Sequence, residues 1–285
     1  MNQFLFFVLA IFSFSWSCFS AQYELAVAAI FKNDAFYLKE WVEYHRKVGV
    51  SHFWLYDDES SDNWREVLQP YIDENLVEVF DWSACRKQIG KWPQIQIEAY
   101  KDAIARASGV SDWIALIDTD EFILPMKEKT VPECLKKHFS KDNAVYVSWL
   151  VFGTSGKVLG KGDSLLKKLT SCSPLKHSWN NAGKTIVRPE KVAIDRIWYV
   201  HHFPLIDSNE YRSGSGRLMY MEDDDLSSQG HESKYIRINH YFFRDENFFR
   251  NVKIERKLAR NMSVAELFYL YDICSQAQDT LILNK

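Results

Sequence analysis

The stretch Trp113-Ile114-Ala115-Leu116-Ile117-Asp118-Thr119-Asp120-Glu121-Phe122 lies near the middle of the chain and guides the interpretation of the rest. Its first five residues are apolar, which predicts a strand buried on both faces. Asp118 and Asp120 follow, and residues two apart on a strand point to the same side. A carboxylate pair at the carboxyl end of a central strand lies where open α/β sheets bind ligands. Two such oxygen donors suit Mg²⁺ or Mn²⁺, which often bind together with substrate phosphates.

The spacing of the two aspartates does not by itself identify a site. Asp223-Asp224-Asp225 has the same spacing in a plainly polar stretch, and Asp is common at strand ends because turns favour it. The surroundings of Asp118 and Asp120 are different, with a hydrophobic strand before them and the apolar segment 122–125 after them. We therefore interpret Asp118 and Asp120, with Glu121 beside them, as functional residues.

The composition is that of a globular protein without a strong charge bias. The chain has 285 residues, 47% of them hydrophobic, which is enough for one large domain or two small ones. The 35 basic and 38 acidic residues leave a net charge of −3, so there is no electrostatic case for nucleic acid as a partner. Ten Trp, 14 Tyr and 19 Phe are a heavy aromatic load, and sugar-binding clefts use aromatic faces as cores do.

Residues 4–19 form an apolar and uncharged run, followed by the small residues Ser20 and Ala21. This pattern predicts that residues 1–21 are a signal peptide or, if they are not cleaved, a membrane anchor. The three residues before the run lack the Lys or Arg that export signals usually carry. We expect export or membrane association through residues 4–19 in preference to a cytoplasmic location.

Four cysteines follow this segment, at positions Cys85, Cys134, Cys172 and Cys274. They allow two disulfides in an oxidising compartment, with three possible connectivities, or four buried thiols. Their wide spacing does not match a metal-binding signature.

Apolar runs alternate with helical patterns through the first half of the chain. Residues 24–31 and 50–56 predict buried strands, and residues 93–107 predict a helix. Strands that recur with helices between them are typical of βαβ units. The sequence therefore predicts an α/β fold with a mainly parallel central sheet flanked by helices. The acidic segments 57–59 and 118–121 then lie at the same carboxyl edge of that sheet.

The second half is less regular, but charged and histidine side chains accompany its predicted strands. Residues 184–190 predict a strand that carries Lys184 and Arg188 on alternate positions. His202 follows an apolar segment, and residues 236–241 predict a strand that ends near His240. Each of these histidines is interpreted either as a ligand or as a hydrogen-bonded residue at a strand end.

Five segments carry a resemblance to a known family. They are Lys32-Asn33-Asp34 through Gly49-Val50; Leu55 through Asp62; Trp113 through Phe122; Lys184 through Glu190; and Ile238-Asn239-His240-Tyr241. In this order they resemble the glycosyltransferases of family 92, which belong to the family-2-like group with a GT-A fold. The resemblance spans residues 24 to 260. Asp34 departs from it, because the family usually has Glu there, and residues 207–234 have no counterpart.

The resemblance implies one GT-A domain over residues 22–285, with a nucleotide-binding half at 24–125 and an acceptor and catalytic half at 126–285. It implies transfer of a sugar from a nucleotide sugar, of the UDP-sugar type, to a glycan or glycoconjugate, with inversion at the sugar carbon. It also implies a divalent cation, Mn²⁺ or Mg²⁺. Such an ion would neutralise the charge that develops on the departing diphosphate.

Roles follow for the residues that match. Asp118, Asp120 and Glu121 are the expected catalytic acidic group. Asp118 and Asp120 would bind the metal, with His240 as third ligand or His202 as its alternative. The residues expected at the nucleotide and its diphosphate are Lys32, Asn33, Asp57, Asp58, Lys184 and Arg188. Displacement with inversion also needs a general base, for which the candidates are Asp163, Glu190 and Asp224.

Two other functions are weighed. A phosphatase of the haloacid-dehalogenase type also has two aspartates after a strand, but it has Thr or Val where this chain has Phe122, and its βαβ series follows the motif. A non-catalytic protein that binds glycans or nucleotide sugars on the same fold is the second alternative. Binding of a UDP-sugar without turnover would favour it.

Overall fold

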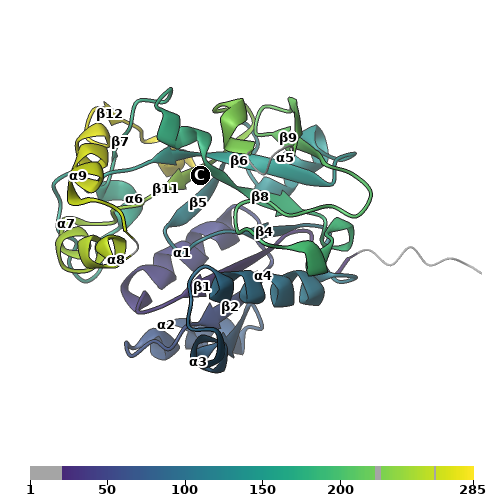
Figure 1. The fold of residues 1–285 in the computed structure, drawn as a ribbon, viewed down its shortest axis with the longest axis horizontal. Helices are drawn as coiled ribbons and strands as arrows, with labels where there is room; N and C mark the ends of the chain where they lie inside the picture. The colour runs from purple at the N-terminus through teal and green to yellow at the C-terminus, as the bar shows by residue number, and fades with distance from the viewer. Residues whose placement is uncertain (1–20, 222–225, 260) are drawn as a thin grey trace, which may run out of the picture.

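The computed structural model describes residues 21–221, 226–259 and 261–285, and Figure 1 shows their arrangement. The strands are β1 Ala26–Phe31, β2 His52–Asp57, β3 Val77–Asp81, β4 Ile114–Leu116, β5 Glu121–Pro125, β6 Ala144–Val151, β7 Ser171–Cys172, β8 Gly183–Val187, β9 Glu210–Ser213, β10 Leu218–Tyr220, β11 Ile236–His240 and β12 Ala277–Gln278. The α-helices are α1 Ala35–Lys47, α2 Trp64–Asp73, α3 Ser83–Ile89, α4 Gln94–Ala107, α5 Val131–His138, α6 Leu165–Lys168, α7 Glu246–Phe248, α8 Ile254–Leu258 and α9 Val264–Ile273. Shorter helical segments are η1 Ser178–Asn181, η2 Pro189–Lys191, η3 Ile194–Arg196, η4 Leu226–Gln229, η5 Phe249–Lys253 and η6 Leu281–Asn284.

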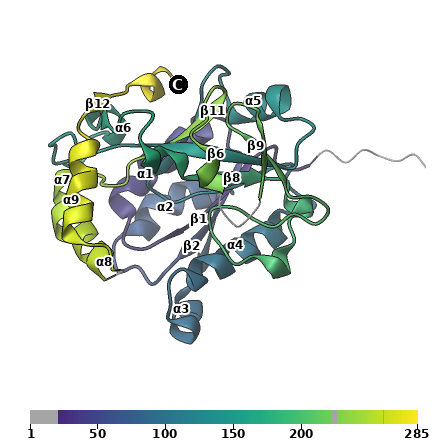
Figure 2. The same ribbon diagram turned by 45° about the horizontal axis from the view of Figure 1, so that its top comes forward.

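The main sheet has the strand order β10-β9-β6-β8-β4-β1-β2-β3. Strands β4, β1, β2 and β3 are parallel neighbours, as expected for a chain in which strands and helices alternate. Helices flank these strands on both sides, with α1 and α2 on one side and α4 on the other (Figures 1 and 2). The predicted α/β fold with a mainly parallel central sheet is therefore confirmed.

The side chains of β1 explain why this strand lies at the centre. All of its residues are buried, and they alternate between two hydrophobic cores. Val27 and Ala29 belong to the core that contains α1, whereas Ala28 and Ile30 pack with α4. A strand that is covered on both faces needs apolar residues at every position, which is why it forms a continuous apolar run.

Strand β8 connects the two halves of the sheet. It pairs antiparallel with β4, where Leu116 faces Thr185, and antiparallel with β6, where Ser148 faces Gly183. Strands β4 and β6 consequently run in the same direction and end at the same edge as β1 and β2. The carboxyl ends of β2 and β4 therefore meet there, as we predict from the sequence.

One part of the first half departs from the prediction of a parallel block. After β4 the chain turns at residues 117–120, and β5 pairs antiparallel with β11 rather than extending the parallel strands. The register places Glu121 opposite His240. The apolar segment after the two aspartates is thus a second strand, which ties the turn to the C-terminal half of the chain.

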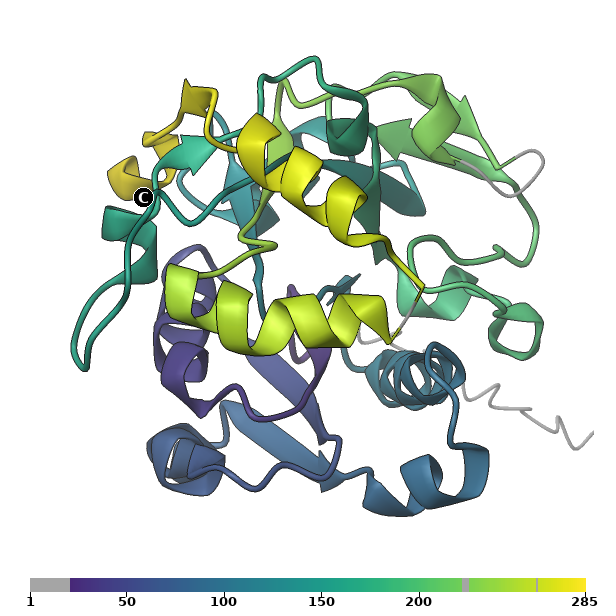
Figure 3. The same cartoon turned by 60° about the vertical axis from the view of Figure 1, so that its left-hand side comes forward.

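A helical segment made of α7, η5 and α8 crosses the front of the molecule in Figure 3, beneath α9. Its middle part, η5, is a π-helical turn. Such turns are rare, and they occur frequently at functional sites.

The expected signal or anchor segment at residues 4–19 lies outside the described residues. Within the residues that the structure covers, we find no helix with both the length and the apolar composition needed to cross a bilayer. The cysteines at positions 85, 134, 172 and 274 are free thiols. Burial raises the pKa of the thiols of Cys134 and Cys274 to about 12, so both stay protonated at neutral pH.

Candidate active site

Asp118 and Asp120 lie in the turn between β4 and β5, which Glu121 closes. The backbone N–H of Asp118 donates to Oε2 of Glu121 at 2.8 Å, and the N–H of Glu121 donates to the carbonyl of Asp118 at 3.0 Å. Glu121 is fully buried, and this burial raises its pKa well above the ordinary value. The structure therefore places Glu121 behind the turn, where it holds the backbone of Asp118.

The Asp118 carboxylate is held from two elements. Lys184 on β8 donates to Oδ2 at 3.0 Å, and Gln96 on α4 donates to Oδ1 at 2.7 Å, where the hydroxyl of Tyr100 also donates at 3.3 Å. Lys184 is almost completely buried. Burial alone would lower its pKa, but the carboxylates of Asp118 and Glu121 outweigh this and raise the pKa well above the usual value. Lys184, predicted to hold a diphosphate, is instead bound to the carboxylates below the site.

Asp120 faces different partners, which come from the end of the chain. Nε2 of His240 lies 3.5 Å from its Oδ1, and Nζ of Lys253 lies 3.5 Å from its Oδ2. The N–H of Tyr241 donates to the carbonyl of Asp120 at 2.8 Å, which fixes β11 against the turn. Although burial opposes it, the charges of Lys253 and His240 hold the pKa of Asp120 well below its usual range.

Lys253 is a site residue that the sequence alone did not reveal. It lies in the π-helical turn η5. Its Nζ is 3.8 Å from the centre of the Phe242 ring, and Nζ of Lys257 is 4.5 Å from the same point. Burial lowers the pKa of Lys253 to about 7, and Lys257 and Arg244 add to this effect against the opposing charge of Asp120. No sequence pattern links Lys253 to Asp120, which lies 133 residues earlier in the chain.

Asp120 and His240 fit a divalent cation as two of its ligands. Adjacent ligands of an octahedral ion lie about 3 Å apart when each is 2.0–2.1 Å from the metal, close to the 3.5 Å found here. The other ring nitrogen of His240 has no hydrogen-bond partner among the described residues. In the part of the chain that the structure describes, no group of three or more His, Cys, Asp or Glu side chains is arranged as a metal site. Asp118 lies two residues before Asp120, and its side chain is 36% exposed.

A buried network supports the turn from the opposite side. Arg244 donates two hydrogen bonds to Asp34, at 2.8 and 2.9 Å, and one to the hydroxyl of Thr119 at 3.0 Å. Thr119 in turn donates to Asp34 at 2.5 Å. Arg244 has a φ of 51°, which few residues other than glycine adopt. Asp34, where the resembling family usually has Glu, therefore anchors the middle of the Asp-Thr-Asp turn.

The loops after β1 and β2 form the neighbouring part of the edge. The N–H of Ser61 donates to Oδ1 of Asn33 at 2.7 Å, and the N–H of Ser60 donates to Oδ1 of Asp57 at 2.9 Å. Asp58 is buried and receives two hydrogen bonds from Arg86 of α3. Nζ of Lys32, in the loop after β1, lies 3.6 Å from Oε2 of Glu59, in the loop after β2. Four of the six residues that we predict at the nucleotide and its diphosphate therefore lie together in these loops, namely Lys32, Asn33, Asp57 and Asp58.

The helical segment α7–α8 covers this edge. Arg256 donates to the carbonyl of Lys32 at 3.2 Å, so the segment reaches from the turn network at Arg244 to the loop after β1. Figure 3 shows the segment crossing in front of the strands. Its cations Lys253 and Lys257 are therefore held beside Asp120.

Several predicted site residues do not join this cluster. Arg188 lies at the other end of β8, where it donates to the carbonyls of Asp142 and Ser140, so it is not placed to hold a diphosphate. Glu190 follows it and accepts from the N–H of Gly109. Asp163 pairs with Lys168 and accepts from the N–H of Gly160. Asp224 lies outside the described residues.

His202 is buried. The charge of Asp118 affects the pKa of its neighbour His201. Nδ1 of His201 lies 2.7 Å from the carbonyl of Gly183, at the start of β8. Burial lowers the pKa of His201 to about 3, with a further contribution from Lys184 and an opposing one from Asp118. Of the two histidines that we predict as third metal ligand, the structure brings His240 to Asp120, with Nε2 3.5 Å from Oδ1.

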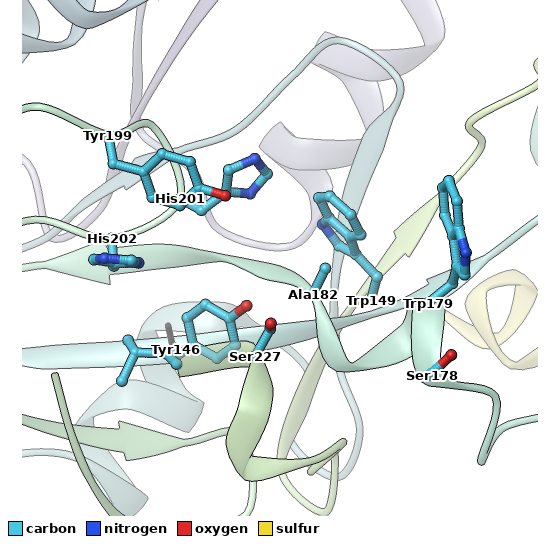
Figure 4. Close-up of a pocket in the computed structure, with 10 residues that line it drawn as sticks. Tyr146, Trp149, Ser178, Trp179, Ala182, Tyr199, His201, His202 and Ser227 are labelled. Atoms are coloured by element: carbon cyan, nitrogen blue, oxygen red, sulfur yellow. The ribbon is translucent and has the colours of Figure 1, made fainter. Parts of the chain in front are cut away.

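A pocket of about 400 Å³ adjoins this cluster on the side of β6 and β8 (Figure 4). Aromatic and histidine side chains make up most of its wall. The residues that line it are Tyr146, Trp149, Ser178, Trp179, Ala182, Tyr199, His201, His202, Leu226 and Ser227. The ring of Trp149 lies 4.4 Å from that of His240 and 5.4 Å from that of His201, so the pocket and the Asp120 centre share a wall.

The geometry is that of an α/β protein with acidic side chains paired with lysines at the carboxyl edge of a parallel sheet, where such folds bind ligands. The chain belongs to glycosyltransferase family 92, whose family model matches residues 22–262. A family 92 protein of Ricinus communis is 29% identical over 66% of this chain and 33% of its own length. The β-1,4-galactosyltransferase galt-1 of Caenorhabditis elegans is 23% identical over 67% of this chain and 45% of its own length.

The chain spans about a third of the length of the family 92 proteins from plants that it matches. Among solved structures, residues 1–349 of TarS from S. aureus align with a TM-score of 0.42 and 12% identity, over 88% of this chain and 70% of that one. At that TM-score the likeness supports no inference about function.

Proposed function

We propose that the protein is a metal-dependent, inverting glycosyltransferase that moves a sugar from a UDP-sugar to a hydroxyl of a glycan or glycoconjugate. The observation that carries this proposal is the placement of Asp120 and His240, 3.5 Å apart at the carboxyl edge of the sheet, in a chain of family 92. A related protein bears the name of a β-1,4-galactosyltransferase, which supports a hexose as the transferred sugar.

The loops after β1 and β2 would bind the nucleoside part of the donor. Asp57 and Asp58 lie at the end of β2, and Asn33 lies in the next loop along the same edge. Both loops are held by internal hydrogen bonds, so their polar groups are in place before a ligand arrives. Preorganised loops lose less entropy on binding, which favours this edge as the nucleotide subsite.

The diphosphate would then lie beside Asp118 and Asp120, under the helical segment that carries Lys253 and Lys257. When the bond between the sugar carbon and the diphosphate oxygen breaks, negative charge grows on the diphosphate. A divalent cation held by Asp120 and His240 would stabilise that charge as a Lewis acid. Lys253 lies 3.5 Å from Asp120 and would contribute a second positive charge at the same place.

The arrangement of the two subsites supports inversion. The nucleotide loops lie over β1 and β2, whereas the aromatic pocket lies over β8 and β6, on the other side of β4. A hydroxyl that enters from the pocket would approach the sugar carbon from the side away from the diphosphate. The new bond would form on that side as the old bond breaks, and the proton of the hydroxyl would pass to a general base.

The test compares the wild type with Asp120→Asn and with Asp73→Asn as a matched control, since Asp73 is exposed at the end of α2. Release of UDP from UDP-galactose, UDP-glucose and UDP-N-acetylglucosamine would be measured with Mn²⁺, with and without a mixed glycan acceptor. Binding of UDP would be measured by calorimetry with Mg²⁺ and with chelator. We expect Asp120→Asn to lose about a hundredfold or more in rate, and Asp73→Asn to lose none.

Full activity of a folded Asp120→Asn variant, insensitive to chelator, would overturn the proposal. Tight binding of UDP without turnover of any donor would favour a non-catalytic nucleotide-sugar-binding protein instead.

We also propose export or membrane attachment through residues 4–19, which rests on their apolar and uncharged sequence. Mass spectrometry of the protein from its own host provides the test. A soluble product that retains Met1 would contradict the proposal, a product that begins near Ala21 would indicate cleavage, and an intact membrane-bound product would indicate an anchor.

A further inference from the structure

The aromatic pocket between β6, η1 and the segment 199–202 has a place in the fold that defines what it can bind. In the order β1-β4-β8-β6, neighbouring strands lie 4.7–4.9 Å apart, so β6 is about 10 Å from β4. Trp149 comes directly after Ser148, which lies opposite Gly183 at the edge where Asp118 and Asp120 emerge. A group held over β6 in the pocket is therefore about 10 Å from a group held over β4 beside Asp118.

The pocket also contains an unsatisfied hydrogen-bond donor. Trp149 is only 9% exposed, and its indole N–H has no acceptor among the described residues. Figure 4 shows the nitrogen on the side of the indole that faces His201 and Tyr199. A buried polar group without a partner costs free energy, and a ligand that supplies an acceptor recovers it.

The walls and the unsatisfied donor point to one class of ligand. Trp149 and Trp179 contribute indole faces, Tyr199 is 37% exposed, and Ser178 and Ser227 also line the pocket. Aromatic faces pack against the C–H face of a pyranose, while polar groups bind its hydroxyls. The volume of about 400 Å³ is within the range of small-molecule sites.

We propose that this pocket is the acceptor subsite and binds the terminal hexopyranose of the acceptor glycan, with one sugar hydroxyl accepting the Trp149 indole N–H. The proposal rests on the proposed glycosyl transfer and deepens it, because it names the acceptor as a hexopyranoside and gives Trp149 and Tyr199 roles in binding it. The donor sugar, which is tied to the diphosphate, lies over β4 and does not fill this pocket.

The experiment uses the full chain and nuclear magnetic resonance of the indole N–H groups. Methyl β-galactopyranoside, methyl β-glucopyranoside and methyl α-mannopyranoside are titrated separately, with erythritol as a non-pyranose control. Trp149→Phe identifies the Trp149 signal and leaves the other indole signals as a check of folding. We expect at least one hexopyranoside, and not erythritol, to shift the Trp149 signal in a saturable way.

Tyr199→Ala should weaken the fitted affinity for that sugar by about tenfold, through the loss of one aromatic face. Tyr269→Ala is the matched control, because Tyr269 is 58% exposed on α9 and does not line the pocket. It should leave the affinity unchanged. If Trp149→Phe does not fold, the titration of Tyr199→Ala against Tyr269→Ala still decides the question.

The inference is overturned if no hexopyranoside moves the Trp149 signal, or if Tyr199→Ala binds sugar as well as Tyr269→Ala does. UDP is titrated in a parallel sample with Mg²⁺, and its binding is followed at the backbone signals of Asn33 and Asp58. Sugar binding without UDP binding would contradict the proposed function and retain the pocket as a hexopyranoside site, so the two failures are distinguishable.

Discussion

The two acidic regions at the carboxyl edge of the sheet differ in where their partners come from. In the loop after β2, Asp57 accepts from Ser60, which is three residues away, and Asp58 pairs with Arg86, which is 28 residues away. In the turn after β4, Asp118 pairs with Lys184 across 66 residues and Asp120 with Lys253 across 133 residues. The first region is held by its own loop and by partners no more than 28 residues away, whereas the second is assembled from β8, β11 and the C-terminal helical segment.

In the proposed function, the loop after β2 supports the site and the turn after β4 takes part in the reaction. A carboxylate that satisfies nearby N–H groups stabilises its loop and needs no ligand. Two carboxylates that meet in one turn repel each other unless positive charge is supplied, and here lysines supply it from distant elements. Neither Lys184 nor Lys253 belongs to the turn itself. In the proposed function, a cation and a diphosphate could therefore replace these lysines as partners of the two carboxylates.

The largest expected effect tests the distant partner of Asp118. Lys184→Met should destabilise the fold by about 3 kcal/mol, since breaking a buried ion pair costs about 3–5 kcal/mol. The lower end applies because the Asp118 side chain is 36% exposed and keeps contact with water. Urea denaturation at pH 7 measures the change.

Lys184→Met combined with Glu121→Gln is the matched control. Oε2 of the fully buried Glu121 lies 4.0 Å from Nζ of Lys184, and Gln removes the ionisable carboxyl group while keeping an acceptor for the N–H of Asp118. We expect the double variant to recover part of the lost stability. A single variant as stable as the wild type would show that Lys184 does not balance these carboxylates.

Lys253→Met tests the distant partner of Asp120. Its main effect should be on the ligand, with UDP affinity in the presence of Mg²⁺ reduced about thirtyfold, because a hydrogen bond to a charged group contributes about 1.5–3 kcal/mol. Calorimetry measures the affinity, and Lys141→Met, at an exposed position before β6, is the control. Unchanged affinity with reduced stability would mean that Lys253 only neutralises Asp120.

The sequence was most informative where partners are local or where a pattern is regular. The apolar runs that became β1, β2 and β4 and the helical pattern that became α4 predicted the parallel half, and with it the common edge of Asp57 and Asp118. His240 could also be placed, because the end of a strand is visible in a sequence. These features depend on neighbouring residues alone.

The remaining parts of the site depend on strand order and register. Lys184 and Arg188 lie four residues apart on one strand, but β8 runs antiparallel to β4, so the first reaches Asp118 and the second lies at the opposite edge, over the ring of Trp113. The sequence alone does not show whether β8 runs parallel or antiparallel to β4. Lys253, Arg244 and Trp149 were missed for the same reason, since tertiary packing brings the first two to the turn and Trp149 to His240.

His45 lies between the two cases, because it has one local and one distant partner. Nδ1 lies 2.8 Å from the carbonyl of Trp41, and Nε2 accepts from the N–H of Ile123 on β5 at 3.2 Å. Burial lowers its pKa to about 3. Between pH 6.5 and 3 the unfolded chain therefore binds a proton that the folded protein does not, and stability falls as the pH is lowered through this window.

His45→Gln should lose about 1.5 kcal/mol at pH 7, because its amide cannot match both hydrogen bonds. Its further loss of stability between pH 6.5 and 3 should be smaller than that of the wild type, because Gln does not titrate. Urea denaturation at pH 7, 5 and 4 measures both effects. His177→Gln is the control, and a parallel pH dependence of His45→Gln and wild type would contradict the assignment.

Asp57 should show the smallest effect, because its loop has several independent supports. Asp57→Ala removes the acceptor for the N–H of Ser60, but Ser60 Oγ still accepts from the N–H of Asn33, and the N–H of Ser61 still donates to Asn33. We expect a loss of about 1 kcal/mol, which is typical of one hydrogen bond. Asp57→Asn keeps an acceptor oxygen and should leave the stability nearly unchanged.

Denaturation and UDP calorimetry on both variants separate two roles of the Asp57 carboxylate. If Asp57 only holds the loop, UDP affinity follows stability and is weakened in Asp57→Ala alone. If UDP affinity falls in Asp57→Asn while stability does not, the charge of Asp57 contacts the nucleotide, and a carboxylate with a local partner then also belongs to the reacting site.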